Sequence, residues 1–310
     1  MIYTLTLNPA IDKTVTVPGF TPGAVNRVTS LRQDVGGKGI NVSKCLIQLG
    51  AETTAAGFFG GDAGRWMTNQ LENAKIPVLA VAINGESRTN LKIVDGEKCQ
   101  NTDINEPGPE ISPEEMDALL VKLEDALQPG DILVLSGSLP KGVPVTLYRD
   151  LCFRFRKRNI SVYMDADGEN FRQGITAAPD LVKPNEVELA RFVGKTLEKE
   201  EELLAAATGL LNRGIGTVLL SLGAEGALLC RKEGCWRAKG LTVPVISTVG
   251  AGDSMVAAMA YAQEKNMPWS ERLALAVAIS AASVSCSGTQ APTREAIDDL
   301  LPRVQVEQLY

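Results

Sequence analysis

The most informative absence is that of histidine: none of the 310 residues is a histidine. Histidine is the side chain most often used as a general base and as a metal ligand. Its absence excludes a Ser-His-Asp triad, a Cys-His pair and every metal site that depends on imidazole. We therefore expect a carboxylate to act as the base in any reaction that this chain catalyses.

Clustered cysteines are also missing. The cysteines include no Cys-x-x-Cys pair, and their spacing is too wide for a zinc site. Cys230 and Cys235 flank Arg-Lys-Glu-Gly, which predicts a hairpin turn that could bring them together. Free thiols, as in cytoplasmic proteins, are nevertheless expected throughout. The cysteines are Cys45, Cys99, Cys152, Cys230, Cys235 and Cys286.

Neither a signal peptide nor a membrane span is expected. Residues 1–7 lack a basic segment and a long apolar core, and they predict a β-strand instead. The longest apolar stretch, residues 273–286, is short and rich in Ala and Ser, which is typical of a buried helix. The net charge of −6 argues against a nucleic-acid partner. We expect a cytoplasmic protein that binds neither membranes nor nucleic acid.

What the sequence does contain is a regular alternation of strand-like and helix-like segments. Repeated βα units predict an α/β fold, with a mostly parallel sheet and helices on both faces. Apolar residues make up 45% of the chain, so residues 1–310 are expected to form one large domain, with at most a small appendage. Strands are predicted at 2–7, 53–58, 132–135, 161–165 and 217–221, and helices at 38–49, 62–73, 113–127, 145–158, 198–213, 252–264, 270–286 and 293–300.

Two regions interrupt this alternation. Residues 13–17 with 26–33, and 87–94 with 98–104, predict strands that have no helix between them. Asp95-Gly96 suits the turn of a hairpin. We expect the segments of about 13–33 and 87–106 to form a small separate sheet beside the main one.

The most informative motif is Thr-Val-Gly-Ala-Gly-Asp-Ser at residues 248–254, just before an apolar helical run. Backbone amides at a helix start favour anions, and glycines let an anion approach them closely. Asp253 then stands beside the anion site, in the first turn. The pattern indicates phosphoryl transfer, in which the amides stabilise the phosphoryl group and Asp253 takes the proton from the attacking hydroxyl. The alternative is an ordinary helix N-cap.

Polar residues near the small sheet could hold a sugar or a phosphate. Gly36-Gly37-Lys38-Gly39 precedes a helix but lacks the spacing of a Walker A loop, so it suits close approach to a polyol or is an ordinary turn. Asp12 follows the first strand, where α/β sheets bind ligands, and could accept hydrogen bonds from two sugar hydroxyls. Arg88 could bind a phosphate bidentately. Asp12 and Arg88 could equally be solvated.

Two further motifs follow predicted strands. In Lys-Pro-Asn-Glu-Val-Glu, residues 183–188, Asn185 and Glu188 share a helix face and suit Mg²⁺ held mostly through water. The alternative is a capping box, in which the two side chains only close the helix start. In Ser-Leu-Gly-Ala-Glu-Gly, residues 221–226, the glycines allow backbone contact with a nucleotide, or form a plain connection between strands.

Taken together and in this order, the motifs resemble those of the PfkB (ribokinase-like) family of carbohydrate kinases. The resemblance covers essentially the whole chain. It rests on TLNPAID, GGKGINVSK, KPNEVE and STVGAGDSM, with SGSLP as a fifth motif, at residues 6–12, 36–44, 183–188, 247–255 and 136–140. The motifs TLNPAID and STVGAGDSM resemble those of the hexose-phosphate branch of the family.

The resemblance implies a ribokinase-like Rossmann-type core with a small β-sheet lid, and a kinase that uses ATP and Mg²⁺. It implies Asp253 as the base, with the amides of Gly250, Ala251 and Gly252 as an anion hole. It implies that Asn185 and Glu188 position the metal through water. The nucleotide site would comprise Lys183, Asn185, Ser221, Gly223, Gly226, Thr248 and Val249, and the sugar-phosphate site Asp12, Gly37, Lys38, Asn41, Arg88 and Ser138.

The expected substrate is fructose 1-phosphate, phosphorylated at its 6-hydroxyl to give fructose 1,6-bisphosphate. Tagatose 6-phosphate is the alternative, since it is also a ketohexose monophosphate with a primary hydroxyl at the far end. A Rossmann dehydrogenase is disfavoured because no Gly-x-Gly-x-x-Gly follows the first strand, and a non-catalytic sugar-phosphate sensor is disfavoured by Asp253. An apolar lid face, with Ile93 and Ile104 as candidates, predicts a homodimer through the lid.

Overall fold

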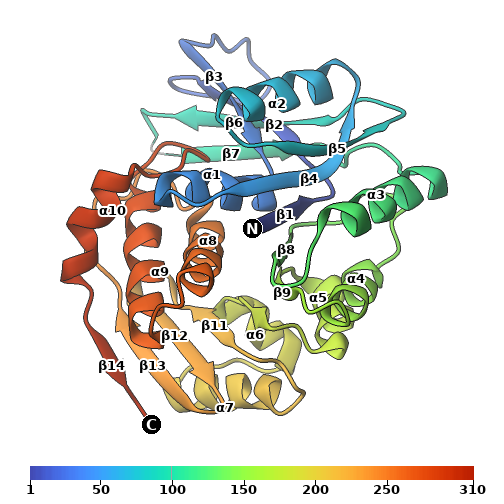
Figure 1. Ribbon diagram of the computed structural model, residues 1–310. Coiled ribbons are helices and arrows are strands. Elements are labelled where there is room, and N and C mark those ends of the chain that lie inside the picture. Colours follow the sequence, from blue (N-terminus) through green and yellow to red (C-terminus); the bar gives the residue numbers. More distant parts are fainter. Residues whose placement is uncertain (99) are drawn as a thin grey trace.

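The computed structural model describes residues 1–98 and 100–310, which form two sheets of unequal size (Figure 1). The larger sheet is flanked by helices, and the smaller one lies beyond its upper edge in Figure 1. The strands of the larger sheet are β1 (Ile2–Thr6), β4 (Thr53–Gly60), β5 (Val78–Ile83), β8 (Ile132–Ser136), β9 (Ser161–Asp165), β10 (Leu181–Val182), β11 (Val218–Ser221), β12 (Gly226–Arg231), β13 (Gly234–Lys239) and β14 (Val306–Gln308).

The strand order of the larger sheet is β14-β13-β12-β11-β10-β9-β8-β1-β4-β5. The strands from β11 to β5 pair in parallel, whereas β12, β13 and β14 add antiparallel pairs at one edge. All five residues of β8 are buried, as expected for a continuous apolar strand covered on both faces. The prediction of a mostly parallel sheet is therefore confirmed.

Helices cover both faces of this sheet, and each layer packs its own apolar cluster against the strands. A capping box at Ser112 begins the helix that was predicted at 113–127, with the Ser112 hydroxyl accepting from the Glu115 amide. One layer contains α3 (Pro113–Ala126), α4 (Leu147–Arg156), α5 (Gly168–Gly174), α6 (Glu186–Val193) and α7 (Glu200–Leu211). The other contains α1 (Lys38–Leu49), α2 (Gly61–Asn73), α8 (Ala251–Glu264), α9 (Trp269–Val284) and α10 (Arg294–Leu300).

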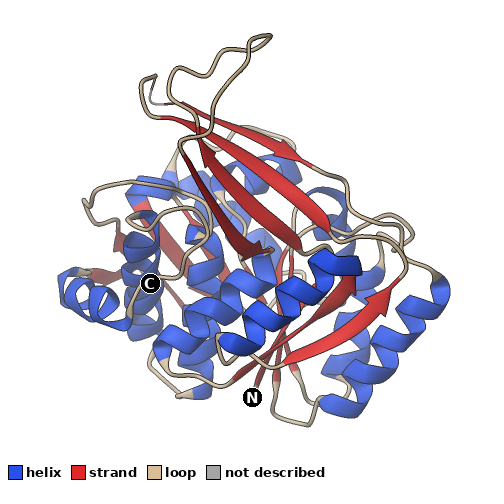
Figure 2. Ribbon diagram, turned by 90° about the horizontal axis from the view of Figure 1, so that it is seen from above, coloured by secondary structure: helices blue, strands red, loops and turns tan. Residues whose placement is uncertain are grey.

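The smaller sheet, called the lid below, has the order β3-β2-β6-β7, with β2 (Ala10–Thr16), β3 (Ser30–Gly36), β6 (Arg88–Asp95) and β7 (Gln100–Asn105). Its first segment thus extends from 10 to 36, beyond the predicted 13–33, because β2 and β3 pair down to Ala10 and Gly36. Figure 2 shows the lid strands projecting from the core, with loops at their far end. The chain joins the core at the opposite end, where Ala10 pairs with both Gly36 and Arg88.

The two faces of the lid differ in polarity because side chains alternate along each strand. Ile93 lies on the apolar face, but it is buried inside this chain against Val15, Val17 and Phe20, so it is not free for a partner. Ile104, which pairs with Leu91, is 53% exposed. The polar face carries Asp12, Arg88, Asn90 and Lys92, and it faces the cavity described below.

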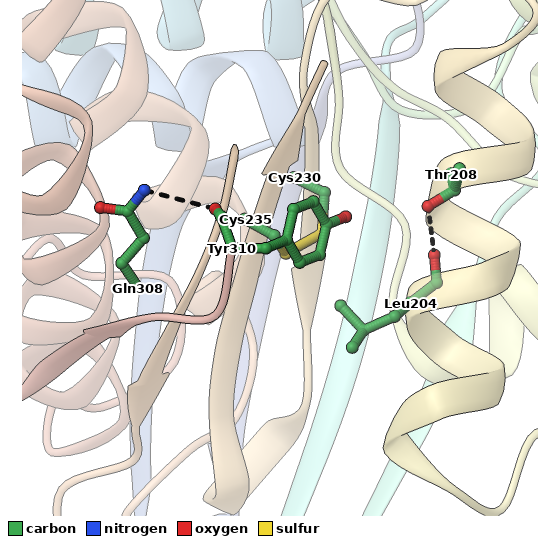
Figure 3. The surroundings of a disulfide bond; sticks show 6 residues. All are labelled: Leu204, Thr208, Cys230, Cys235, Gln308 and Tyr310. Atoms are coloured by element: carbon green, nitrogen blue, oxygen red, sulfur yellow. Dashed lines mark hydrogen bonds between the residues drawn. A yellow bond between two sulfur atoms is a disulfide. The ribbon is translucent and has the colours of Figure 1, made fainter. Parts of the chain in front are cut away.

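Two predictions about local structure need correction. The helix predicted at 145–158 is shorter in the structure, where α4 extends from Leu147 to Arg156. Residues 145 and 146 form a turn before it, and Asn159 has a left-handed backbone conformation after its end. The expectation of free thiols is wrong for Cys230 and Cys235, which lie opposite each other in the β12–β13 hairpin and form a disulfide (Figure 3). Among the described residues, Cys45, Cys152 and Cys286 are free, and the prediction for Cys99 lies outside them.

A separate observation concerns membranes. In the described parts of the chain, no helix combines the length and the apolar character needed to cross a bilayer.

Candidate active site

Asp253 lies in the first turn of α8, which begins after left-handed Gly250. Gly250, Ala251 and Gly252 at this helix start are half-buried, whereas Asp253 is only 5% exposed. A Cβ atom on Gly252 would lie 2.9 Å from Lys183 Nζ, so glycine lets the lysine approach the helix start. Because the first amides of a helix have no acceptor within it, they remain available to an anion at this position.

Asn41, from the first turns of α1, holds the Asp253 carboxylate. Its side-chain amide donates a hydrogen bond of 2.8 Å to Asp253 Oδ2. Burial, together with the nearby Asp165 carboxylate, raises the pKa of Asp253 to about 6, although Lys38, Asn41 and Lys183 act in the opposite direction. A carboxyl group with this pKa is ionised at neutral pH and is still a useful proton acceptor.

Asp165 is a residue of this site that the sequence analysis missed. It ends β9, is fully buried, and its Oδ1 atom lies 3.3 Å from Lys38 Nζ and 3.5 Å from Lys183 Nζ. Burial alone would raise the pKa of Asp165, but the two ammonium groups outweigh it and hold that pKa below its usual range. Asp165 in turn raises the pKa of Lys38. Asp165 Oδ2 is buried and has no hydrogen-bond partner among the described residues.

Asn185 and Glu188 form the capping box that was the alternative in the sequence analysis. Asn185 Oδ1 accepts from the Glu188 amide at 2.8 Å, and Glu188 Oε2 accepts from the Asn185 amide at 2.9 Å. Both side chains also line the cavity, so the cap orients them towards it. An isolated parallel bridge between Asn185 and Ser221 brings the β11 loop to the same place.

The lid contributes Asp12 and Arg88. Asp12 Oδ1 accepts a hydrogen bond of 2.9 Å from the Asn90 side chain, and burial raises the pKa of Asp12. The Arg88 guanidinium donates through Nε and Nη2 to the Asn8 carbonyl, at 3.2 and 3.0 Å, and through Nη1 to the Glu106 carbonyl at 3.1 Å. Arg88 therefore ties the base of the lid to the segments that enter and leave it.

These groups surround one cavity of about 540 Å³, which lies between the carboxyl ends of the parallel strands and the polar face of the lid. Within the described chain, four residues that were expected near the ligands do not line it: Ala251, Thr248, Gly223 and Gly226. The remaining expected residues do line it, namely Asp12, Gly37, Lys38, Asn41, Arg88, Ser138, Lys183, Asn185, Glu188, Ser221, Val249, Gly250, Gly252 and Asp253.

Comparison with known proteins agrees with this arrangement. The model of the pfkB family of carbohydrate kinases matches residues 5–296. A protein named 1-phosphofructokinase from Rhodobacter capsulatus is 38% identical over 309 residues, covering 99% of this chain and 98% of that protein. Another of that name, from Escherichia coli (strain K12), is 36% identical over 308 residues, covering 99% and 98%.

Solved structures agree in fold. Phosphofructokinase-2 from Escherichia coli, in complex with substrates and products, has a TM-score of 0.93 and 31% identity, covering 97% of this chain and 98% of that chain. A possible 1-phosphofructokinase from Thermotoga maritima has a TM-score of 0.87 and 25% identity, covering 100% of both chains.

Proposed function

The chain belongs to the pfkB family of carbohydrate kinases, and on that basis we propose that it uses ATP to phosphorylate fructose 1-phosphate at the 6-hydroxyl, giving fructose 1,6-bisphosphate. The observation that carries the proposal is the position of Asp253. Its carboxyl group is buried at the start of α8, has a pKa raised to about 6, and lines a cavity whose opposite wall is the polar face of the lid. The relatives that bear the name 1-phosphofructokinase support the choice of substrate.

In the proposed reaction, the 6-hydroxyl oxygen attacks the γ-phosphorus of ATP while Asp253 takes the hydroxyl proton. The bond between the γ-phosphorus and the bridging oxygen breaks, and ADP leaves with that oxygen. The amides of Gly250, Ala251 and Gly252 stabilise the charge on the transferring phosphoryl group. This mechanism requires a base and an anion site at the same helix start, and Asp253 lies at the start of α8.

We assign the two sides of the cavity to the two substrates. Asp12, with the Gly37–Asn41 segment and Ser138, faces the sugar phosphate, and Lys183 with the β11 loop faces the nucleotide. Gly223, Gly226 and Thr248 stay proposed nucleotide contacts and the Ala251 amide stays a proposed phosphoryl contact, although these four residues lie outside the cavity lining.

Oxygen donors near the proposed phosphate position fit a hydrated Mg²⁺ ion. Glu188 has one carboxylate oxygen outside its cap, and Asp165 Oδ2 is buried without a partner among the described residues. No three His, Cys, Asp or Glu side chains of the described chain cluster as a metal cage, which suits an ion held mainly through water and phosphate. When bound, Mg²⁺ would neutralise charge on the ATP phosphates, and Asn185 and Glu188 would hold it through water.

The metal assignment predicts that Glu188→Gln raises the Mg²⁺ concentration for half-maximal rate by about tenfold, as losses around metal sites commonly do. A neutral amide holds the hydrated ion less well but can still cap the helix. Glu115→Gln is the matched control, because Glu115 closes the same kind of capping box in α3, outside the cavity. A Glu188→Gln titration that coincides with wild type would mean that Glu188 only caps α6.

The substrate assignment is tested by measuring ADP release with a panel of ketohexose monophosphates and with free fructose. Phosphorus NMR of the product then identifies the oxygen that receives the phosphoryl group. We expect fructose 1-phosphate to give the highest kcat/KM, with a product phosphorylated at both ends. A higher kcat/KM for tagatose 6-phosphate would make that sugar the substrate. An equal kcat/KM for free fructose would refute the hexose-phosphate assignment.

We also propose that the chain forms a homodimer through the apolar face of the lid. Ile104 and Leu31 lie on that face and are 53% and 55% exposed. Ile104→Glu is expected to convert a dimer into a monomer in light scattering at micromolar concentration, because it buries a charge in the contact. Val121→Glu on α3, which is similarly exposed, is the control. A fully active wild-type monomer would contradict the proposal.

The cytoplasmic location of the protein remains a prediction.

A further inference from the structure

One of the cationic side chains that line the cavity has no role in the proposed function. Among the described residues that line it, the cationic ones are Lys38, Arg88, Lys92 and Lys183. Lys38 and Lys183 are both paired with Asp165, at 3.3 and 3.5 Å. The Arg88 guanidinium donates hydrogen bonds to the carbonyls of Asn8 and Glu106. The two cations that the sequence analysis assigned to the sugar phosphate, Lys38 and Arg88, therefore already have partners.

Lys92 differs from these three cations. It lies on β6, on the same face as Arg88 and Asn90, and its ammonium makes no hydrogen bond or ion pair within residues 1–98 and 100–310. In the register of the lid it stands between Thr14 of β2 and Asp103 of β7, and no ion pair joins it to Asp103. It is half-buried. A lysine that is partly removed from water and makes no ion pair can bind an anion.

The surrounding charges make this cation necessary for an anionic substrate. Asp12, Asp34 and Asp103 also line the lid side of the cavity, and of these Asp34 is paired with Arg32 at 2.7 Å. Without an unpaired cation, Asp12 and Asp103 would repel a phosphate dianion. Lys92 lies two residues beyond Asn90, which holds Asp12, so its side chain is displaced by about 7 Å along the lid from that pair. A sugar whose hydroxyls contact Asp12 could place its phosphate against Lys92.

We propose that Lys92 binds the phosphate of the sugar substrate and sets the preference for a phosphorylated ketohexose over the free sugar. The inference rests on the proposed function, since it concerns the same cavity and the same substrate class. Arg88 then acts as a positioning residue that anchors the lid strand on which Lys92 stands.

The test compares Lys92→Met, which keeps the length of the side chain but removes its charge, with Lys92→Arg, which keeps the charge. Lys13→Met is the control: Lys13 is on the same sheet, pairs with Leu91, and does not line the cavity. Steady-state kinetics and calorimetric titration with fructose 1-phosphate, in the absence of ATP, are measured for each. We expect Lys92→Met to raise both KM and Kd for fructose 1-phosphate by about 10- to 100-fold, as loss of a charged hydrogen bond does.

The other measurements separate this role from a structural one. KM for ATP and the melting temperature should stay near wild type in Lys92→Met, and Lys92→Arg should recover most of the affinity. Unchanged fructose 1-phosphate binding in Lys92→Met would overturn the assignment of Lys92 alone. Wild-type protein that binds fructose 1-phosphate without phosphorylating it would overturn the proposed function alone, and equal binding of free fructose would overturn both.

Discussion

Replacing Asp253 with asparagine is expected to lower kcat by about 10²- to 10⁴-fold while ATP still binds, because the substitution keeps the shape and removes the base. The Asn41 side chain can still hydrogen-bond the new amide oxygen, so the site should keep its form. Stopped-flow or coupled assays give kcat, and calorimetry gives the affinity for ATP. Asp62→Asn, in the exposed first turn of α2, is the matched control. Turnover close to wild type in Asp253→Asn would rule out the mechanism.

The pH dependence of the wild-type enzyme provides a second test of the role of Asp253 as the base. Because burial and Asp165 raise the pKa of Asp253 to about 6, the base is lost by protonation below that pH. The value of kcat/KM should therefore fall about tenfold for each pH unit below the pKa. The chain contains no histidine, so this acid limb cannot come from an imidazole. In Asp253→Asn the remaining activity should lose this limb.

The second large effect is expected from Asp165→Asn. Asp165 and Lys183 are both buried, with side-chain exposures of 1% and 5%. Neutralising the carboxylate leaves an uncompensated buried ammonium group, which commonly costs about 3–5 kcal/mol of unfolding free energy. Denaturant unfolding at neutral pH measures this loss. Asp298→Asn, which breaks the half-exposed pair with Arg294, is the control and should cost less than about 1 kcal/mol. Equal stability of the two variants would contradict a tightly held Asp165 site.

The same variant makes two predictions about pH. The Asp165 charge raises the pKa of Asp253, so its removal should move the acid limb of kcat/KM to lower pH. The pKa of Asp165 itself is lowered in the folded state, so its stabilising contribution is present at neutral pH and is lost as the pH falls below the usual carboxyl range. The unfolding free energies of wild type and Asp165→Asn should therefore converge in acid.

The parts of the site that could be predicted are those encoded locally. Gly250 to Asp253 form one helix start, and Asn185 to Glu188 form another, so a short motif fixes each geometry. The alternation of strands and helices likewise predicted the parallel sheet, since it depends on periodicity within each segment. The short strand β14 (Val306–Gln308), with three residues, gave no pattern that could be recognised.

The parts that could not be predicted depend on contacts between distant segments. Asp165 is 127 residues from Lys38 in sequence, and nothing in either segment indicates that they pair. The position of Asp165 at the end of a predicted buried strand was the available signal, because ligand sites gather at such ends. The partners of Arg88 are main-chain carbonyls, which every residue carries and which no sequence pattern marks. The disulfide required the hairpin register, which the turn residues alone did not supply.

The attachment of the lid determines how it can move. In the described chain, the strands β2, β3, β6 and β7 all join the core at one edge, where Ala10 pairs with Gly36 and Arg88 and where β7 ends at Asn105. A plate fixed along one edge swings about a single axis, and displacement grows with distance from that axis. In a rotation about that axis, the ends near Thr16 and Asp95 would travel farthest and Arg88 least. A pair of fluorescent probes, one at the free end of the lid and one on the core, would therefore show the largest change in distance for a given rotation.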